Sequence, residues 1–256
     1  MEFIMNLTGK YALISGASRG IGKAIAEKYF KEGATVYLLS RNAEELSNTA
    51  LEIDPTGQRA FAVPCDVTST TSIKEVFKRF KASDIYIDIL VNAAGIACAK
   101  PIEDLDYEEW DRTINTNLTG SFMLCQKCLD GMKHKGGGKI INIASLMSEV
   151  ARPGLAAYCA SKGGLLMFTK CLAVEWAKYN IQANTIIPGY IDTIMVEEIR
   201  NNPSTNQNVI NKTPAGRWGL ADDVADVALF LASKNSNFIT GADIPVDGGV
   251  LASLQL

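Results

Sequence analysis

The stretch YALISGASRGIGKAIAEKYF, residues 11–30, decides the fold of this chain. It begins with the apolar run Tyr11–Ile14, which predicts a short buried strand, and it ends in a helical pattern. Between the two, Gly16, Gly20 and Gly22 follow the spacing G-x-x-x-G-x-G. A glycine-rich turn lets the backbone approach a pyrophosphate, which the free N–H groups and the dipole of the new helix attract. The stretch therefore predicts a dinucleotide-binding turn, with a purely structural turn as the alternative.

The end of the next apolar run, 35–39, indicates which nicotinamide cofactor fits. Enzymes that prefer NAD usually carry an acidic residue here, which binds the ribose 2′-hydroxyl. This chain has Ser40 and Arg41 instead. An acid would repel a 2′-phosphate, whereas a guanidinium holds it through paired, charge-assisted hydrogen bonds. Arg19, inside the glycine turn, would reach the same phosphate. The sequence predicts NADP(H), and two solvated surface arginines are the alternative.

A tyrosine and a lysine, Tyr158 and Lys162, stand four residues apart within 155–168, which has the pattern of one long, largely apolar helix. Residues at this spacing lie on the same helix face. A fixed positive neighbour favours the phenolate of a tyrosine. Such a pair can move a proton to or from a substrate oxygen, and two unrelated surface neighbours are the alternative.

Ser145 follows the apolar run 139–144 and precedes Tyr158 by 13 residues. It is therefore expected at the carboxyl end of a parallel strand, where open α/β sheets bind ligands. No Ser-His-acid arrangement competes with it, because the only histidine, His134, stands in the polar segment 133–138. We expect His134 to be a solvated loop residue.

Together these features resemble the short-chain dehydrogenase/reductase family. The length of 256 residues is typical of the common branch of this family. The residues that carry the resemblance are Ser15–Gly22, Asp66, Asn92–Gly95, Asn117, Ser145, Tyr158, Lys162, Pro188–Gly189 and Asp247–Gly249. They follow the family's order and spacing over essentially the whole chain. The resemblance implies hydride transfer between the nicotinamide C4 and a secondary alcohol or ketone carbon.

The resemblance also implies catalytic roles. Tyr158 would be the general acid/base, and Lys162 would lower its pKa and hold the nicotinamide ribose. Ser145 would hydrogen-bond the substrate carbonyl, and Asn117 would hold a water of the proton relay. Tyr158 and Ser145 would therefore touch the substrate, and no metal site is expected.

Cofactor contacts are implied along most of the chain. Asp66 would touch the adenine amino group, with Val67 beside it. The full set is Gly16, Ser18, Arg19, Gly20, Ile21, Gly22, Ser40, Arg41, Asp66, Val67, Asn92, Ala93, Gly95, Tyr158, Lys162, Pro188, Gly189, Ile191 and Thr193. Two positions depart from the family pattern. Ser15 replaces the usual threonine but keeps its hydroxyl, and Ala93 replaces a second asparagine, which removes one amide behind the cofactor.

Several segments are similar to gluconate 5-dehydrogenases and related sugar or polyol reductases: 147–152, 180–182, 213–219 and 247–252. Glu149 and Arg152 could bind hydroxyls or a carboxylate there, and a structural ion pair between them is the alternative. The segment 96–100 lacks an arginine that sugar-acid enzymes often carry, which suits a neutral keto-sugar better.

Two other functions stay open. The segment 114–120 looks equally like 3-oxoacyl-carrier-protein reductases, although Tyr179 stands where these enzymes would have a basic residue for the acidic carrier. A protein that binds NADP(H) without catalysis is the other alternative, but such proteins tend to lose the tyrosine or the lysine.

The polar segment 197–211 is the most irregular part of the sequence, and the family usually has a mobile lid over the substrate here. An ordinary solvated loop is the alternative. Long helices around 103–133 and 157–179 usually form dimer and tetramer interfaces in this family, so a homotetramer or homodimer is expected.

Composition agrees with a single α/β domain spanning residues 1–256. Short apolar runs alternate with helical segments, at 11–15, 35–40, 59–64, 87–91, 138–144, 181–187 and 243–247, and predict a doubly wound parallel sheet. A net charge of −3 gives no basic field for nucleic acid. No apolar stretch of about 20 residues could span a membrane, and the N-terminus lacks a signal-peptide pattern, so we expect a cytoplasmic protein. Among six cysteines, Cys125 and Cys128 have CxxC spacing but are expected to pack inside a helix.

Overall fold

A parallel sheet of seven strands, in the order β3-β2-β1-β4-β5-β6-β7, forms the centre of the computed structural model, which describes residues 5–253. The strands are β1 (Tyr11–Ser15), β2 (Thr35–Ser40), β3 (Ala60–Pro64), β4 (Ile89–Asn92), β5 (Gly138–Ile143), β6 (Ile181–Pro188) and β7 (Asp243–Val246). All seven expected strands are present, and the prediction of a doubly wound parallel sheet is confirmed.

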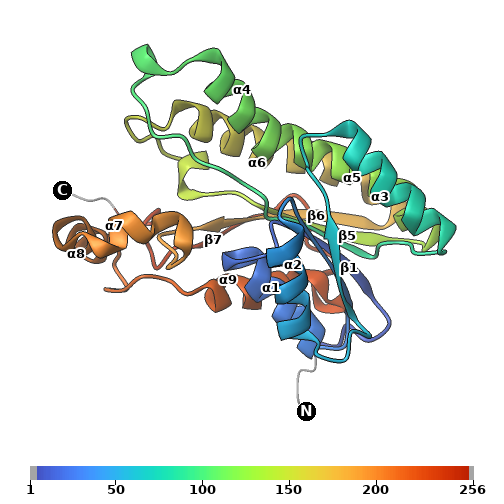
Figure 1. Cartoon of the computed structure of the whole chain (residues 1–256). Helices are drawn as coiled ribbons and strands as arrows, with labels where there is room; N and C mark the ends of the chain where they lie inside the picture. Colours follow the sequence, from blue (N-terminus) through green and yellow to red (C-terminus); the bar gives the residue numbers. More distant parts are fainter. Residues whose placement is uncertain (1–4, 254–256) are drawn as a thin grey trace.

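Helices cover both faces of the sheet (Figure 1). One face carries α1 (Gly20–Lys31), α2 (Ala43–Ile53) and α9 (Ala221–Ala232), and the other carries α3 (Thr70–Ala82), α5 (Gly120–His134) and α6 (Ala156–Trp176). The remaining helices are α4 (Tyr107–Ile114), α7 (Glu197–Asn201) and α8 (Pro203–Lys212). Because both faces are covered, strand residues are buried on both sides, as the continuous apolar runs in the sequence indicate.

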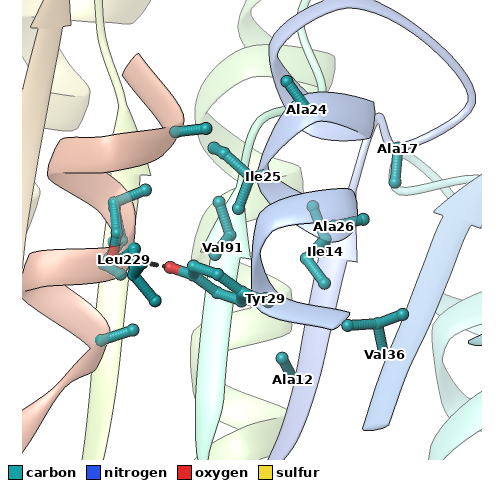
Figure 2. Close-up of a cluster of buried hydrophobic side chains, with 14 of the residues drawn as sticks. Ala12, Ile14, Ala17, Ala24, Ile25, Ala26, Tyr29, Val36, Val91 and Leu229 are labelled. Atoms are coloured by element: carbon teal, nitrogen blue, oxygen red, sulfur yellow. Dashed lines mark hydrogen bonds between the residues drawn. The ribbon is translucent and has the colours of Figure 1, made fainter. Parts of the chain in front are cut away.

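Alternate residues of β1 enter the two halves of the core. Ile14 packs on the α1 and α9 side, and Leu13 packs on the opposite side. The centre of the first side is Tyr29 of α1, whose fully buried ring lies between the sheet and α9 (Figure 2). Its hydroxyl donates a 2.8 Å hydrogen bond to the carbonyl oxygen of Ala228. The hydrogen bond satisfies the one polar atom of this buried side chain.

The chain reverses its direction of strand addition between β1 and β4, which are parallel neighbours with Ala12 opposite Ile89. The first half of the chain adds β2 and β3 on one side, and the second half adds β5, β6 and β7 on the other. Such a switch point opens a crevice beyond the carboxyl ends of the strands, where ligands bind in open α/β sheets.

The structure corrects three expectations. The segment 197–211 is not irregular, because it forms α7 and most of α8. The long helix expected around 103–133 is two helices, α4 and α5, which are joined by a π-helical turn, η2 (Asn115–Thr119). His134 is exposed, as expected, but it is the last residue of α5 rather than a loop residue, and its ring lies 4.4 Å from that of Tyr86.

Candidate active site and cofactor cleft

A cleft of about 450 Å³ opens at the carboxyl ends of β1, β2, β3 and β4, at the switch point. Its lining includes most of the predicted cofactor residues: Gly16, Ser18, Arg19, Gly20, Ile21, Gly22, Ser40, Arg41, Asp66, Val67, Ala93, Gly95 and Thr193. It also includes residues outside the predicted cofactor set: Leu39, Cys65, Ala94, Ile96, Ala97, Thr116, Ile194 and Met195.

The glycine turn fits a dinucleotide pyrophosphate. Gly16 adopts a positive φ of 67°, and a Cβ there would lie 2.8 Å from Cα of Ala94. A Cβ on Gly22 would lie 2.3 Å from the carbonyl oxygen of Gly16. The helix that follows, α1, begins without a side-chain cap at Arg19 and without an acidic residue in its first turn. Its first N–H groups therefore remain available to an anion.

Two arginines stand at the rim of the cleft. Arg19 and Arg41 are both exposed, and the only acidic group near either guanidinium within residues 5–253 is Glu45, 4.0 Å from Arg19. At the other end of the lining, Asp66 accepts hydrogen bonds from the backbone N–H and hydroxyl of Thr68 through Oδ1 alone. Its second oxygen is free to accept from a ligand amino group. This rim favours a phosphate-bearing nucleotide.

The fully buried side chain of Asn117, in the π-helical turn, joins the cleft to α6. Its Oδ1 accepts from the N–H of Ile96 at 2.9 Å, and its Nδ2 donates to the carbonyl of Ile96 and to Oγ of Ser161, both at 2.9 Å. These bonds use both N–H donors of the amide and one acceptor position of its oxygen. The side chain therefore acts as a clamp, and π-turns of this kind recur at functional sites. Its proposed hold on a relay water stays a prediction.

Ser145, Tyr158 and Lys162 come together beside the cleft. Ser145 follows β5 and caps the short helix η3 (Leu146–Ser148), where its Oγ accepts from the N–H of Met147 at 3.2 Å. Lys162, one turn along α6 from Tyr158, is buried and donates from Nζ to the carbonyl of Ile143 at 2.7 Å. A Cβ on Gly95 of the cleft would lie 3.5 Å from this Nζ. The lysine thus spans the space between the tyrosine and the cleft.

The electrostatics of the pair differ from the sequence-based expectation. Burial raises the pKa of Tyr158 above 10, and the hydrogen bond with Ser145 lowers it by less. The Nζ of Lys162 lies 5.8 Å from the centre of the tyrosine ring, and burial lowers the pKa of this lysine to about 8. The hydrogen bond with Ser145 favours the phenolate, but the cost of burying its charge is larger, so the phenol form dominates.

Some predicted cofactor residues lie outside the cleft lining. Asn92 is buried and directs its Nδ2 to Oδ1 of Asn142 at 2.8 Å, behind the cleft. Pro188, Gly189 and Ile191 lie on or just after β6, and Ile191 lines a different cavity beside β7. For these four residues, contact with a cofactor stays a prediction.

Glu149 and Arg152 are exposed in the loop after η3. Within residues 5–253 they form no ion pair with each other, so the structural alternative for this pair is wrong. Neither residue lines the cofactor cleft. A role in binding substrate stays a prediction.

Two hydroxyl residues have positioning roles that the sequence does not predict. Ser15 accepts at Oγ from the N–H groups of Ala93 and Ala94, at 3.1 and 3.2 Å, and so holds the turn where the usual asparagine is missing. Ser161 accepts from Asn117 and donates to the carbonyl of Tyr158 at 2.8 Å. Small hydroxyl residues carry no distinctive sequence signal, and only their position between two elements reveals them.

The cysteine pair lies inside α5, as expected. Cys125 and Cys128 are free, buried thiols that pack in the core, and burial raises the pKa of both, to about 12 for Cys125. Within the described chain, no group of three or more His, Cys, Asp or Glu side chains is placed to hold a metal ion. Across the same residues, no helix has the length and apolar character needed to cross a membrane.

A protein-family model described as enoyl-(acyl carrier protein) reductase matches residues 16–251. Gluconate 5-dehydrogenase of Gluconobacter oxydans is 37% identical over 251 residues, which are 98% of this chain and 98% of the relative. NAD-dependent glycerol dehydrogenase of Listeria innocua is 40% identical over 247 residues, 95% of this chain and 94% of the relative.

The crystal structure of a gluconate 5-dehydrogenase from Burkholderia cenocepacia, in complex with NADP and tartrate, superimposes with a TM-score of 0.93. It is 37% identical, and the match covers 98% of each chain. A TM-score of 0.93 over 98% of each chain shows that the two proteins share the same fold.

Proposed function

This chain belongs to the short-chain dehydrogenase/reductase family of oxidoreductases, and we propose that it moves a hydride between NADP(H) and a secondary alcohol or ketone of a sugar, polyol or keto-sugar acid. One observation carries the proposal. The Ser145–Tyr158–Lys162 group stands beside a cleft whose rim presents Arg19 and Arg41. The first set moves a proton at an oxygen, and the second selects a phosphorylated nucleotide.

The bound nicotinamide would supply or accept the hydride, and the rest of the chemistry falls to this chain. In the reductive direction, Ser145 donates a hydrogen bond to the carbonyl oxygen and so polarises the carbon. Tyr158, whose raised pKa keeps its phenol protonated, donates the proton to that oxygen. Lys162 places a buried positive charge beside the phenolate that forms. In the oxidative direction the same groups act in reverse.

The substrate class rests on the relatives and on the loop after Ser145. The two curated relatives described above act on a sugar acid and a polyol by their names, which places several hydroxyls around the reacting carbon. Exposed Glu149 and Arg152 offer an acceptor and a donor for such hydroxyls. Lys100 is held by Glu109 at 2.6 Å, so it does not replace the absent arginine as a free cation near 96–100. The absence of a free cation at this position favours a keto-sugar or polyol over a strongly acidic substrate.

The match to a family model named for carrier-protein substrates favours a second candidate, a 3-oxoacyl-carrier-protein reductase. Lys133 and Lys178 lie against the ring of Tyr179, at 4.1 and 5.1 Å, and supply the positive charge that an acidic carrier needs. They lie, however, at the end of α6 remote from Tyr158, roughly 30 Å along the helix. Docking there would not present a thioester to the catalytic group.

The deciding experiment measures NADPH oxidation by purified protein with 5-keto-D-gluconate, neutral ketoses and an acetoacetyl thioester, with NADH in parallel. We expect turnover of a ketose or keto-acid with NADPH. Turnover of the thioester alone would favour the second candidate. Tyr158→Phe is the matched control: it should lose turnover while it keeps NADPH binding, measured by quenching of protein fluorescence. Unchanged function in this variant would point to a cofactor-binding protein without catalysis.

Three further features belong to this proposal. The α7–α8 segment acts as the lid, since it follows Ile194 and Met195 of the cleft wall and is fastened by Arg200 to Asp192. Protection of this segment from proteolysis by NADP⁺ with substrate would test it.

The protein, a single domain, assembles into a dimer or tetramer through exposed apolar residues of α4, α5 and α6. These residues are Tyr107, Trp110, Phe122, Met167 and Val174, and light scattering would test the assembly. Six free thiols fit a cytoplasmic setting.

A further inference from the structure

A second cavity, of about 230 Å³, lies at the amino ends of β4, β5 and β6, at the edge of the sheet opposite the cofactor cleft. The charged and amide side chains that line it include Lys10, Asp88, Lys135, Lys139, Gln182 and Lys234. They come from five separate parts of the chain, since Lys135 and Lys139 share one segment. The proposed oxidoreductase chemistry uses none of these residues.

Lys139 is the buried residue of this cavity. The second residue of β5, it is 8% exposed. Its Nζ donates to Oγ of Ser236 at 3.1 Å and to Oδ1 of Asn237 at 2.8 Å. Both partners are neutral, and within residues 5–253 no carboxylate lies within 4.0 Å of this ammonium. An ammonium has three donors, so one is left for another acceptor. Buried charges are normally paired, because an uncompensated charge in the interior is costly.

The charged residues around Lys139 add positive charge to the cavity instead of neutralising the charge of this lysine. Asp88 is the one carboxylate of the lining, and it is shared by Lys10 at 3.2 Å and Lys135 at 2.7 Å. Lys234 is exposed and forms no ion pair among the described residues. Four ammonium groups therefore face one carboxylate, an excess of three positive charges, although the chain as a whole carries −3. Burial lowers the pKa of Lys139 to about 8, so it still carries its charge at neutral pH.

We propose that this cavity binds a phosphate-bearing anion, either inorganic phosphate or a small phosphate monoester. A dianion matches the local excess of positive charge better than a monoanion does. Three lysines at the rim and one in the wall supply point-charge donors from several directions, and lysine is a common ligand of phosphate in this form. A cavity of this size has room for a phosphate group or a small phosphate monoester. The competing explanation is that Lys139 only ties β5 to the segment 234–237.

The experiment titrates inorganic phosphate into the protein at constant ionic strength and follows the unfolding temperature and the heat of binding. The cofactor cleft is the other anion site, so the titration is run with excess NADP⁺ and again, without it, in an Arg41→Glu background. Three variants are compared: Lys139→Gln, Lys234→Gln, and the matched control Lys74→Gln. Lys74 is an exposed lysine of α3 with no ion pair among the described residues.

We expect saturable binding in the parent protein and in Lys74→Gln, under both conditions. Lys139→Gln should weaken it at least about tenfold, the size of one lost charged hydrogen bond. Lys234→Gln should weaken it roughly threefold through charge alone. If Lys139→Gln does not fold, Lys234→Gln decides. An equal, unsaturable response of all variants, or a response abolished by NADP⁺, would overturn the proposal. Glycerol phosphate in a parallel titration shows whether an ester binds as well as the free anion.

Discussion

Asn117 and Ser161 lie 44 residues apart in the chain, yet a 2.9 Å hydrogen bond joins Nδ2 of the first to Oγ of the second. The same asparagine holds both backbone groups of Ile96 in the cleft wall. Ser161 in turn donates to the carbonyl of Tyr158 at 2.8 Å. One buried side chain therefore fixes the cofactor cleft relative to the helix that carries the catalytic tyrosine.

Replacing Ser161 with alanine tests this clamp. The change leaves one buried Nδ2 proton of Asn117 without a partner, so we expect unfolding free energy to fall by about 1–3 kcal/mol. Because the cleft and Tyr158 lose their fixed separation, kcat should fall roughly 10- to 100-fold. Denaturant titration and steady-state kinetics measure the two effects. Ser47→Ala is the control, since its exposed hydroxyl only bonds back to Ala43, and it should change stability by less than about 0.5 kcal/mol. Matching results for the two variants would contradict the clamp.

Arg41 sets the preference for the phosphorylated cofactor. We expect Arg41→Glu to raise KM for NADPH roughly 10- to 100-fold, because the new carboxylate repels the 2′-phosphate and one charged contact is lost. KM for NADH should change little, since NADH has no phosphate at that position. The control is Arg79→Glu, which makes the same charge change on the exposed face of α3. Equal effects on both cofactors would contradict the role of Arg41.

Loss of the charge on Lys162 should limit the reductive activity at alkaline pH. Burial lowers its pKa to about 8, so it loses its charge as pH rises through that value. Reductive kcat/KM, which reports ionisations of the free enzyme, should therefore fall above about pH 8. Tyr158 does not cause this fall, because its raised pKa keeps the phenol protonated there. Lys162→Arg should be slower but should lose the fall, since a guanidinium stays charged.

Unfolding of the protein does not explain the expected fall in reductive kcat/KM at alkaline pH. The folded pKa of Lys162 lies below the 10.5 of an unfolded lysine, so the unfolded chain binds more protons between about pH 8 and 10.5. The contribution of this group to stability therefore rises with pH across that window. Denaturant titrations at pH 7 and pH 9 provide the check. A fall in activity that follows a fall in stability would contradict the assignment.

Strand positions could be predicted because a parallel strand buried on both faces, such as β2 with its run Val36–Leu39, is a continuous apolar run. The residues of the cleft could be predicted from the spacing of the glycines in the first turn, because that turn needs backbone conformations that only glycine adopts easily. The polar segment 197–211 forms helices because polarity does not exclude helix, and Asn202-Pro203, a cap followed by proline, is the signal in the sequence that starts α8. The inward orientation of Asn92 could not be predicted, because it depends on Asn142, which lies 50 residues away.

Tyr29 offers a test of the core that is independent of the site. Its fully buried hydroxyl bonds the carbonyl of Ala228 and so joins α1 to α9 (Figure 2). Tyr29→Phe keeps the ring but loses this bond, so we expect unfolding free energy to fall by about 1 kcal/mol at pH 7 with activity unchanged.

The same variant has a pH signature. Burial raises the pKa of Tyr29 well above 10, so the folded state keeps the phenol neutral where an unfolded tyrosine ionises. The stability that this hydroxyl contributes is fully present below about pH 10 and declines above it. The parent protein should therefore lose its advantage over Tyr29→Phe as pH rises past 10, in denaturant titrations at pH 7 and pH 10.5. Tyr107→Phe, at a site 73% exposed, should match the parent at both values. A constant difference between the parent and Tyr29→Phe would mean that the tyrosine ionises equally in both states, which its burial against α9 opposes.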